Sequence, residues 1–242
     1  MSEPLLEVDA VSKSFGGFLA LSQVSLTVRS GERLGIIGPN GSGKTTLINC
    51  ICGSLYSDAG SIGFDGIEVT RLAAHRRARL GIARSFQVPR PFSSMTLAEN
   101  VTVPLEYVAH RRSLHRADVY AEARAILARM GLADRADAPA GALTQVDLRK
   151  LELARALATH PRLLILDEVM AGLSAVEVDE MLGIILELSR QGVTIMMIEH
   201  IMRAIMRFSE RVVCLDAGRI MAEGTPAQIV QNADVQRIYL GD

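Results

Sequence analysis

Apolar residues in the opening third of the chain fall at the spacing of β-strands. LLEVDAV (5–11) and FLALSQVSLTV (18–28) alternate or run apolar, and the turn sequence RSGE precedes another apolar run, RLGIIG (33–38). Alternation at every second residue is typical of a half-buried strand, and a short apolar run bounded by turn residues indicates a fully buried strand. GSIGFDG (60–66) lies between glycine turns and predicts a short edge strand. We therefore expect a strand-rich N-terminal part.

The spacing becomes helical between about residues 93 and 160. TLAENVTVPLEYVAHRR (96–112) and HRADVYAEARAILARMG (115–131) carry apolar residues three or four positions apart, and a glycine follows the last periodic residue of the second run. LELARAL (151–157) is a third apolar-rich helical run. This stretch predicts an all-helical segment.

Strand and helix patterns alternate in the rest of the chain. The expected order is strand RLLILDE (162–168), helix SAVEVDEMLGIILELSRQG (174–192), strand VTIMMIEH (193–200), helix IMRAIMRFSE (201–210), hairpin RVVCLDAGRIMAEG (211–224) and a last helix starting at TPAQIVQN (225–232), with threonine as its cap and proline first. Strands that alternate with helices predict an α/β fold with a parallel sheet, into which the all-helical segment is inserted.

The overall composition narrows the classes of protein that fit. The chain has 242 residues, 49% of them hydrophobic, and a net charge of −1, which suits one well-packed domain or two lobes. A balanced charge argues against nonspecific binding of nucleic acid, which needs a basic face. The N-terminus lacks the features of a signal peptide, and the apolar runs are too short to span a bilayer. Cys50, Cys52 and Cys214 fit buried reduced thiols of a cytoplasmic protein.

The stretch GPNGSGKTT (38–46) matches the phosphate-binding pattern G-x-x-x-x-G-K-[ST] between an expected strand and an expected helix. Its glycines let successive backbone N–H groups face one anion, and the helix N-terminus adds partial positive charge. We expect Lys44 at the β- and γ-phosphates and the Thr45 hydroxyl at Mg²⁺. A chance glycine-rich turn is the alternative. The residues expected to bind a nucleoside triphosphate are Gly38, Pro39, Asn40, Gly41, Ser42, Gly43, Lys44, Thr45 and Thr46.

Two carboxylates follow the buried strand RLLILDE. Asp167 and Glu168 stand at the carboxyl edge of the expected sheet, where ligands of open α/β folds collect. Asp167 suits Mg²⁺, and Glu168 suits polarising the water that attacks the γ-phosphate. Without the phosphate loop, a solvated acidic pair at a strand end would be the better interpretation.

Two further residues fit a site for ATP hydrolysis. Gln87, in ARSFQVPRP, comes before a proline-rich turn and is expected on a mobile loop, and His200 ends the strand VTIMMIEH at another carboxyl edge. Taken alone, each would be interpreted as structural. Their order after a phosphate loop favours a functional role.

With these motifs, the chain resembles the ATP-binding subunit of ABC transporters over essentially its whole length. GPNGSGKTT is similar to the Walker A motif and LLILDE to the Walker B motif, while AGLS (171–174) stands at the D-loop position. The resemblance implies an ABC-type P-loop NTPase fold for residues 1–242, with an antiparallel β subdomain, a helical subdomain at about 93–160 and a C-terminal helical tail at about 225–242. It implies roles for Gln87 as the Q-loop residue, in catalysis and in binding Mg²⁺, for His200 as the switch histidine, and for Phe15 in stacking on adenine, although Phe15 could also be an ordinary core or surface residue.

The same resemblance implies partners. Two ATP-binding subunits would close face to face and drive membrane permease subunits from the cytoplasmic face of the membrane, with an extracytoplasmic solute-binding protein taking part indirectly. The helical segment and the Gln87 loop would receive a permease helix. An apolar stripe in the helical segment is either that surface or ordinary core: Met95, Val101, Val103, Leu105 and Tyr107.

Three stretches indicate the subfamily. GIARSFQ, DEVMAGL and the ending RIYLGD resemble branched-chain amino acid importer ATPases, including relatives that import amides or urea. The ATPase of the lipopolysaccharide exporter is the rival within the family. A soluble ABC ATPase acting on ribosomes or DNA and a P-loop kinase are alternatives from other classes. The first would need two cassettes or long coiled-coil insertions, and the second an acceptor pocket and a lid.

The stretch ALTQVD (142–147) departs from the family signature LSGGQ, or LSYGQ in closer relatives. Thr144 keeps a hydroxyl, but Val146 replaces a glycine and Asp147 replaces a glutamine. Read without the family, Thr144 and Asp147 predict a capping box that uses the same N–H groups and hydroxyl. We therefore expect this helix end to have partly lost its role in binding a partner's ATP, which favours a heterodimer with a second ATP-binding subunit over a homodimer.

Overall fold

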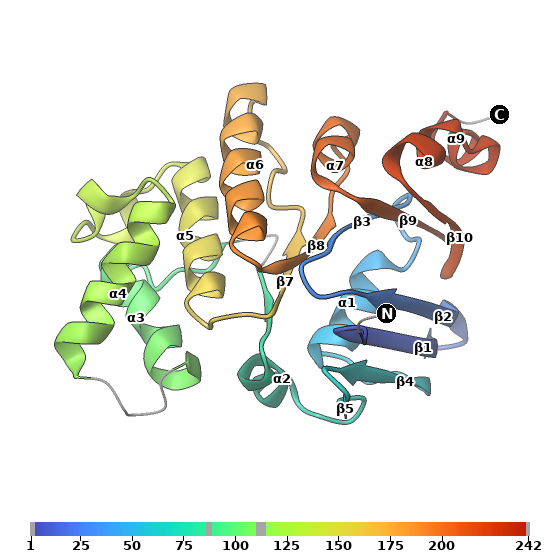
Figure 1. Ribbon diagram of the computed structural model, residues 1–242, viewed down its shortest axis with the longest axis horizontal. Helices are drawn as coiled ribbons and strands as arrows, with labels where there is room; N and C mark the ends of the chain where they lie inside the picture. Colours follow the sequence, from blue (N-terminus) through green and yellow to red (C-terminus); the bar gives the residue numbers. More distant parts are fainter. Residues whose placement is uncertain (1–2, 86–88, 110–114, 241–242) are drawn as a thin grey trace.

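A computed structural model describes residues 3–85, 89–109 and 115–240. It contains a four-stranded antiparallel sheet, a six-stranded mostly parallel sheet and a group of helices at the end away from the antiparallel sheet (Figure 1). The expected α/β fold with a helical insertion is confirmed, as is the expected antiparallel β part near the N-terminus.

The antiparallel sheet has the strand order β2-β1-β4-β5. Its bounds are β1 Leu6–Phe15, β2 Phe18–Val28, β4 Ala59–Phe64 and β5 Ile67–Glu68. The expectation that GSIGFDG forms an edge strand is wrong, because β4 pairs with β1 on one side and with β5 on the other. Asp65 and Gly66 both have positive φ and form the tight turn that brings β5 back onto β4.

The second sheet has the order β10-β9-β3-β8-β7-β6, and only β10 runs antiparallel to its neighbour. Its bounds are β3 Arg33–Ile37, β6 Ile82–Arg84, β7 Leu163–Asp167, β8 Thr194–Ile198, β9 Arg211–Asp216 and β10 Arg219–Gly224. Every residue of β7 and β8 is buried, as continuous apolar runs in a parallel sheet require. The carboxyl ends of β3, β7 and β8 therefore meet along one edge.

Successive residues of β7 belong to two separate cores. Leu163 and Ile165 join the core between the two sheets, where α1 (Lys44–Cys52) packs, and Leu164 and Leu166 join the core on the other face. That second core is covered by α6 (Ala175–Arg190), α7 (Met202–Phe208) and the helical group. The alternation fixes the register of β7 and hence the place of the residues that follow it.

The helical group comprises α3 (Leu97–Pro104), η1 (Leu105–Ala109), α4 (Arg116–Arg129), two short 3-10 turns, η2 (Ala133–Arg135) and η3 (Ala140–Ala142), and α5 (Gln145–Leu157). Val101 and Leu105 are fully buried in the core of this group. For these two residues of the apolar stripe, the interpretation as core is confirmed and a permease-facing role is wrong.

The C-terminal tail has two helices. Thr225 caps α8 (Pro226–Gln231) through a complete capping box with Gln228, as expected from TPAQIVQN. This helix is not the last, because the Asn232 side chain accepts from the N–H groups of Asp234 and Val235 and starts α9 (Ala233–Leu240). Across the described parts of the chain, we find no helix with the length and apolar character needed to cross a membrane.

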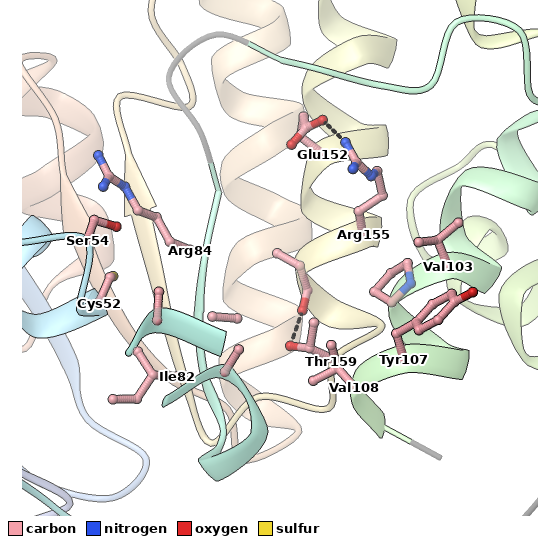
Figure 2. A pocket seen from close by; sticks show the side chains of 15 residues that line it. Cys52, Ser54, Ile82, Arg84, Val103, Tyr107, Val108, Glu152, Arg155 and Thr159 are labelled. Carbon is pink, nitrogen blue, oxygen red and sulfur yellow. Dashed lines mark hydrogen bonds and ion pairs between the residues drawn. The ribbon is translucent and has the colours of Figure 1, made fainter. Parts of the chain in front are cut away.

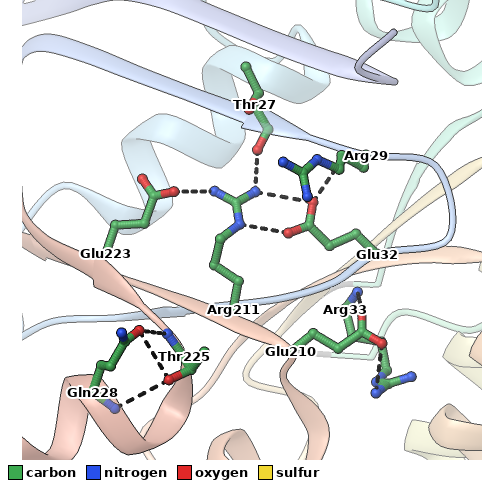
Figure 3. A network of polar contacts seen from close by, with 9 residues as sticks. All are labelled: Thr27, Arg29, Glu32, Arg33, Glu210, Arg211, Glu223, Thr225 and Gln228. Carbon is green, nitrogen blue, oxygen red and sulfur yellow. Dashed lines mark hydrogen bonds and ion pairs between the residues drawn. The ribbon is translucent and has the colours of Figure 1, made fainter. Parts of the chain in front are cut away.

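The Arg211 guanidinium joins the two sheets (Figure 3). It lies 2.6 Å from Glu32, in the turn before β3, and 2.6 Å from Glu223 on β10, and it donates to the Thr27 carbonyl of β2. Five guanidinium N–H donors can satisfy several acceptors at once, so one side chain links several strands. This network lies in a polar hollow beside Thr225 and Gln228, lined by residues other than those of the phosphate loop.

Candidate active site

The phosphate loop connects the end of β3 to the start of α1 with glycines in conformations that other residues rarely adopt. Gly38, Gly41 and Gly43 have φ of 149°, 81° and 104°. A Cβ at Gly38 would lie 2.1 Å from the Leu215 carbonyl oxygen, and one at Gly43 would lie 2.6 Å from the Ala20 carbonyl oxygen. Only glycine fits these two positions. The loop therefore presents bare backbone N–H groups at the N-terminus of α1.

Lys44 is folded back onto the loop that precedes it. Its Nζ donates to the carbonyl oxygens of Gly38 (2.7 Å) and Pro39 (2.9 Å), and the residue is 6% exposed. Burial lowers the pKa of the Lys44 ammonium, while Glu168 and Asp167 act in the opposite direction. The ammonium thus holds the loop in a closed ring, and the two carboxylates favour its charged form.

Two phenylalanines stand beside the loop at the β1–β2 turn. Phe15 and Phe18 pair across Gly16–Gly17, and their exposed fractions are 46% and 65%. Together with Asn40–Thr46 and Glu168 they line a hollow of about 250 Å³. Phe15 was expected near a nucleotide base, whereas Phe18 was missed. The palindrome FGGF was the available signal, because a two-glycine turn brings its flanking residues face to face.

Asp167 ends β7 and is 3% exposed. Its Oδ2 lies 2.6 Å from Nη2 of Arg84, whose Nη1 donates to Asn49 Oδ1 of α1 at 2.6 Å. Arg84 ends β6 and was not singled out by the sequence. It ties the acidic end of β7 to the helix that follows the phosphate loop, and so compensates the buried Asp167 carboxylate.

The oxygen atoms at this edge fit Mg²⁺. Mg²⁺ takes one or two protein carboxylates together with phosphate oxygens and waters, and it needs no cage of protein ligands. The Thr45 hydroxyl at the first turn of α1 lines the hollow, and the Asp167 carboxylate acts electrostatically on Lys44 of the same lining, so both can supply oxygen donors. Within residues 3–85, 89–109 and 115–240, no cluster of three or more His, Cys, Asp or Glu side chains could hold a metal by itself.

Glu168 and His200 meet at the same sheet edge. Oε1 of Glu168 lies 2.7 Å from Nε2 of His200, and Glu168 also lines the hollow beside Lys44. Glu168 has a φ of 51°, and its N–H donates to the Ile198 carbonyl oxygen at 2.9 Å. This left-handed turn directs the side chain away from the sheet and toward the phosphate loop. Gln87, the third expected catalytic residue, lies outside the described residues.

The N-terminus of α5 is capped by side chains of its own first turn. The Thr144 hydroxyl accepts from the Asp147 N–H at 3.3 Å and donates to Asp147 Oδ2 at 2.7 Å, and Arg135 of η2 forms a salt bridge with the same carboxylate. The expected capping box is therefore only half right. Complete boxes at α3, α6 and α8 use Glu or Gln at the third helical position, and aspartate is one methylene shorter.

A groove of about 390 Å³ runs between α5 and η1 on one side and α2 (Ala74–Leu80) and β6 on the other (Figure 2). Its lining is mostly small and apolar, with Arg84 and Glu152 among its few charged residues. Val103 and Tyr107, from the expected stripe, line this groove, and Tyr107 is 71% exposed. Met95 is half-buried and does not line it. The groove reaches Arg84 and hence the side chain that holds Asp167.

Comparisons with known proteins agree with this architecture. A model of the ABC transporter family matches residues 21–171, and one of the branched-chain amino acid ATP-binding cassette transporter matches residues 219–242. The chain is 40% identical to the high-affinity branched-chain amino acid transport ATP-binding protein BraF of Pseudomonas aeruginosa, with full coverage of both chains. It is 39% identical to the corresponding LivG protein of Escherichia coli, again over the whole of both chains.

Solved structures show the same fold. The ADP conformation of MJ1267, an ATP-binding cassette of an ABC transporter, has a TM-score of 0.90 and 31% identity, with full coverage of both chains. The dimeric post-hydrolysis state of the ATP-binding cassette MJ0796, bound to ADP and Pi, has a TM-score of 0.83 and 25% identity, covering 91% of this chain and 98% of that one.

Proposed function

The chain belongs to the ABC transporter family of ATPases, and on this basis we propose that it drives the import of branched-chain amino acids or of related small polar solutes. The support for this substrate class is full-length identity to BraF and LivG together with the C-terminal match at residues 219–242. The same relatives favour an importer over an exporter of lipopolysaccharide type. The substrate itself would be chosen by the membrane and extracytoplasmic subunits.

The contact between Glu168 and His200 beside the phosphate loop is the observation that carries the hydrolytic mechanism. The loop N–H groups and Lys44 hold the phosphates, and Phe15 and Phe18 hold the adenine. Glu168 polarises a water whose oxygen attacks the γ-phosphorus, and the bond to the β–γ bridging oxygen breaks to release ADP and phosphate. His200 orients Glu168. Mg²⁺ at Asp167 and Thr45 would neutralise phosphate charge, and Gln87 keeps its expected role on sequence grounds.

In this proposal a cytoplasmic helix of the permease docks in the groove lined by Val103 and Tyr107, and the chain works at the cytoplasmic face of the membrane. Within one ATP-binding domain of residues 1–242, residues 93–160 would form the inserted helical subdomain and 225–242 the C-terminal tail. The solute-binding protein takes part through the permease, and nucleic acid is not a partner of this nearly neutral chain.

The second ATP-binding subunit is a different chain in this proposal. In a face-to-face pair, the start of α5 would meet the partner's nucleotide. Here the Thr144 hydroxyl donates to the Asp147 carboxylate, which Arg135 holds in place, so the hydroxyl is taken from a phosphate that should approach. A pair of two identical chains would carry this obstacle twice, whereas a heterodimer keeps one composite site intact.

Replacement of Glu168 by Gln tests the hydrolytic mechanism. We expect Glu168→Gln to lower the ATP turnover of the assembled transporter by about 10²-fold or more, since it removes the group that polarises water. ATP binding should persist. The control is Glu122→Gln, since Glu122 also lies 2.6 Å from a histidine, His160, but outside the phosphate-loop hollow. Undiminished turnover in Glu168→Gln would reject the mechanism, and uptake of labelled leucine by the wild-type complex tests the substrate class.

A further inference from the structure

A buried glutamate supports the loop that follows the hydrolytic residues. Glu199 lies between the end of β8 and His200, and it is 2% exposed. Its Oε1 accepts from the Met170 N–H at 2.8 Å, and its carboxylate also accepts from the His200 backbone N–H. The loop Met170–Leu173 and the backbone of His200 are thus held by one side chain.

The other side of this loop rests on α5. Gln145 Nε2 lies so close to Gly172 that a Cβ there would be 2.9 Å away, and Gly172 has a φ of 79°. The Arg149 guanidinium, in a residue that is 7% exposed, lies 3.5 Å from the Ala171 carbonyl oxygen. The loop is therefore enclosed between β8 and the first turns of α5.

Burial of the Glu199 carboxylate costs free energy of hydration, which only its hydrogen bonds and charge contacts can compensate. Burial raises the pKa of Glu199 to about 7, the Glu168 carboxylate adds to the increase, and Arg149 opposes it. Burial also lowers the pKa of Arg149, and Glu199 is its foremost compensating charge. An apolar side chain of similar size would fill the same space without a desolvation penalty, but it would leave the Met170 N–H without an acceptor.

We propose that Glu199 is a positioning residue that fixes His200 and the loop Met170–Leu173, and thereby joins the start of α5 to the pair Glu168–His200. The proposal rests on the proposed function in that His200 and Glu168 carry out hydrolysis. Movement of α5 when a partner subunit closes would reach the hydrolytic pair through this loop. Glu199 itself does not line the phosphate-loop hollow.

Two substitutions separate positioning from mere filling of space. Glu199→Gln keeps an oxygen acceptor for the Met170 N–H, and Glu199→Leu removes it while remaining apolar and of similar size. Glu187→Gln, at an exposed carboxylate on α6, is the matched control. Hydrogen exchange of the segment containing Met170 is measured in the purified full chain, ATP turnover in the assembled transporter, and thermal unfolding in each variant.

We expect Glu199→Leu to speed exchange at Met170 by about tenfold or more, because a buried N–H without an acceptor destabilises the closed state of the loop. Turnover should fall by at least about tenfold at an unchanged KM for ATP, since misplaced catalytic groups lower kcat. Glu199→Gln should remain close to wild type in both measurements. Wild-type exchange and turnover in Glu199→Leu would overturn the proposal, as would equal damage in Glu199→Gln.

The exchange measurement keeps the two proposals separable. If the wild-type transporter does not hydrolyse ATP, or if Glu168→Gln leaves turnover intact, the proposed mechanism fails while exchange at Met170 still reports on the Glu199 contact. If Glu199→Leu unfolds, the protection of the Met170 N–H from exchange in Glu199→Gln tests the positioning proposal instead. Protection equal to wild type supports the positioning contact, and its loss rejects it.

Discussion

Glu168 and His200 touch through their side chains, Oε1 to Nε2 at 2.7 Å, although 32 positions separate them in the chain. The contact follows from the sheet, because β7 and β8 are parallel neighbours in which Asp167 pairs with Ile198. Both residues leave the sheet at the same edge, and the left-handed backbone of Glu168 turns its carboxylate toward the histidine. The histidine thus fixes the direction of the carboxylate that faces the phosphate loop.

Replacement of His200 should impair hydrolysis more than binding. His200→Ala removes the contact that orients Glu168, so we expect ATP turnover to fall by about 10²-fold, in the range of general acid–base contributions. The affinity for ATP should change little. His160→Ala is the control, because His160 also lies 2.6 Å from a glutamate, Glu122, outside the hollow. If His200→Ala had the same ATP turnover as His160→Ala, the contact between His200 and Glu168 would not contribute to hydrolysis.

The two phenylalanines at the β1–β2 turn should hold the base and not the phosphates. We expect Phe15→Ala and Phe18→Ala each to weaken ATP binding by about tenfold, because stacking of an aromatic side chain on a base is worth about 1–3 kcal/mol. Calorimetric titration with ATP and with inorganic tripolyphosphate separates the two effects. A matching loss of affinity for tripolyphosphate would mean that the substitutions disturb the loop itself.

Much of the site could be predicted because its residues stand at the ends of recognisable runs. Two fully buried strands end at or just before Asp167, Glu168 and His200. Parallel strands place their carboxyl ends together. The phosphate loop carries its own glycine spacing. These signals are local, so no tertiary information was needed to find them.

The residues that the sequence did not reveal act through distant contacts. Arg84 meets Asp167 across 83 positions, and Glu199 meets Met170 across 29, so neither pair has a spacing that can be read from the chain. The stripe at Val101 and Leu105 was ambiguous for a similar reason. The face of α3 that is buried depends on how α4 and α5 pack against it, and the periodicity alone gives no partner.

The pKa of Glu199 gives a stability prediction with a definite sign. Because this pKa is raised from 4.5 to about 7 in the folded chain, folding favours the protonated carboxyl. The stabilising contribution is complete below the unfolded pKa and is lost as the pH rises through about 7. The charged groups acting on it are Glu168, which raises the pKa, and Arg149, which lowers it.

Glu199→Gln carries no such proton, so its stability relative to wild type should increase with pH. Between pH 5 and pH 8 we expect the free energy of unfolding of Glu199→Gln to gain about 2–3 kcal/mol on that of wild type. Urea unfolding at four pH values in that interval measures the difference, with Glu187→Gln as the control. A difference that does not change with pH would show that Glu199 titrates normally.

The side-chain contacts at the N-terminus of α5 should prevent the chain from pairing with a second copy of itself. Val146→Gly combined with Asp147→Gln removes the carboxylate that occupies Thr144 and restores a bare backbone beside it. In a Glu168→Gln background, which retains ATP, we expect these two changes to produce ATP-dependent self-association. Arg124→Gln, at an exposed salt bridge of α4, serves as the control because it leaves the start of α5 unchanged.

The mass of the purified Glu168→Gln chain in solution, measured by light scattering with and without saturating Mg-ATP, decides whether the unaltered chain pairs with itself. We expect a monomer that binds ATP, because the Asp147 carboxylate engages the Thr144 hydroxyl that would otherwise meet the nucleotide of an identical partner. A stable dimer that forms only with Mg-ATP would contradict this and would show that Thr144 still reaches a partner's phosphate.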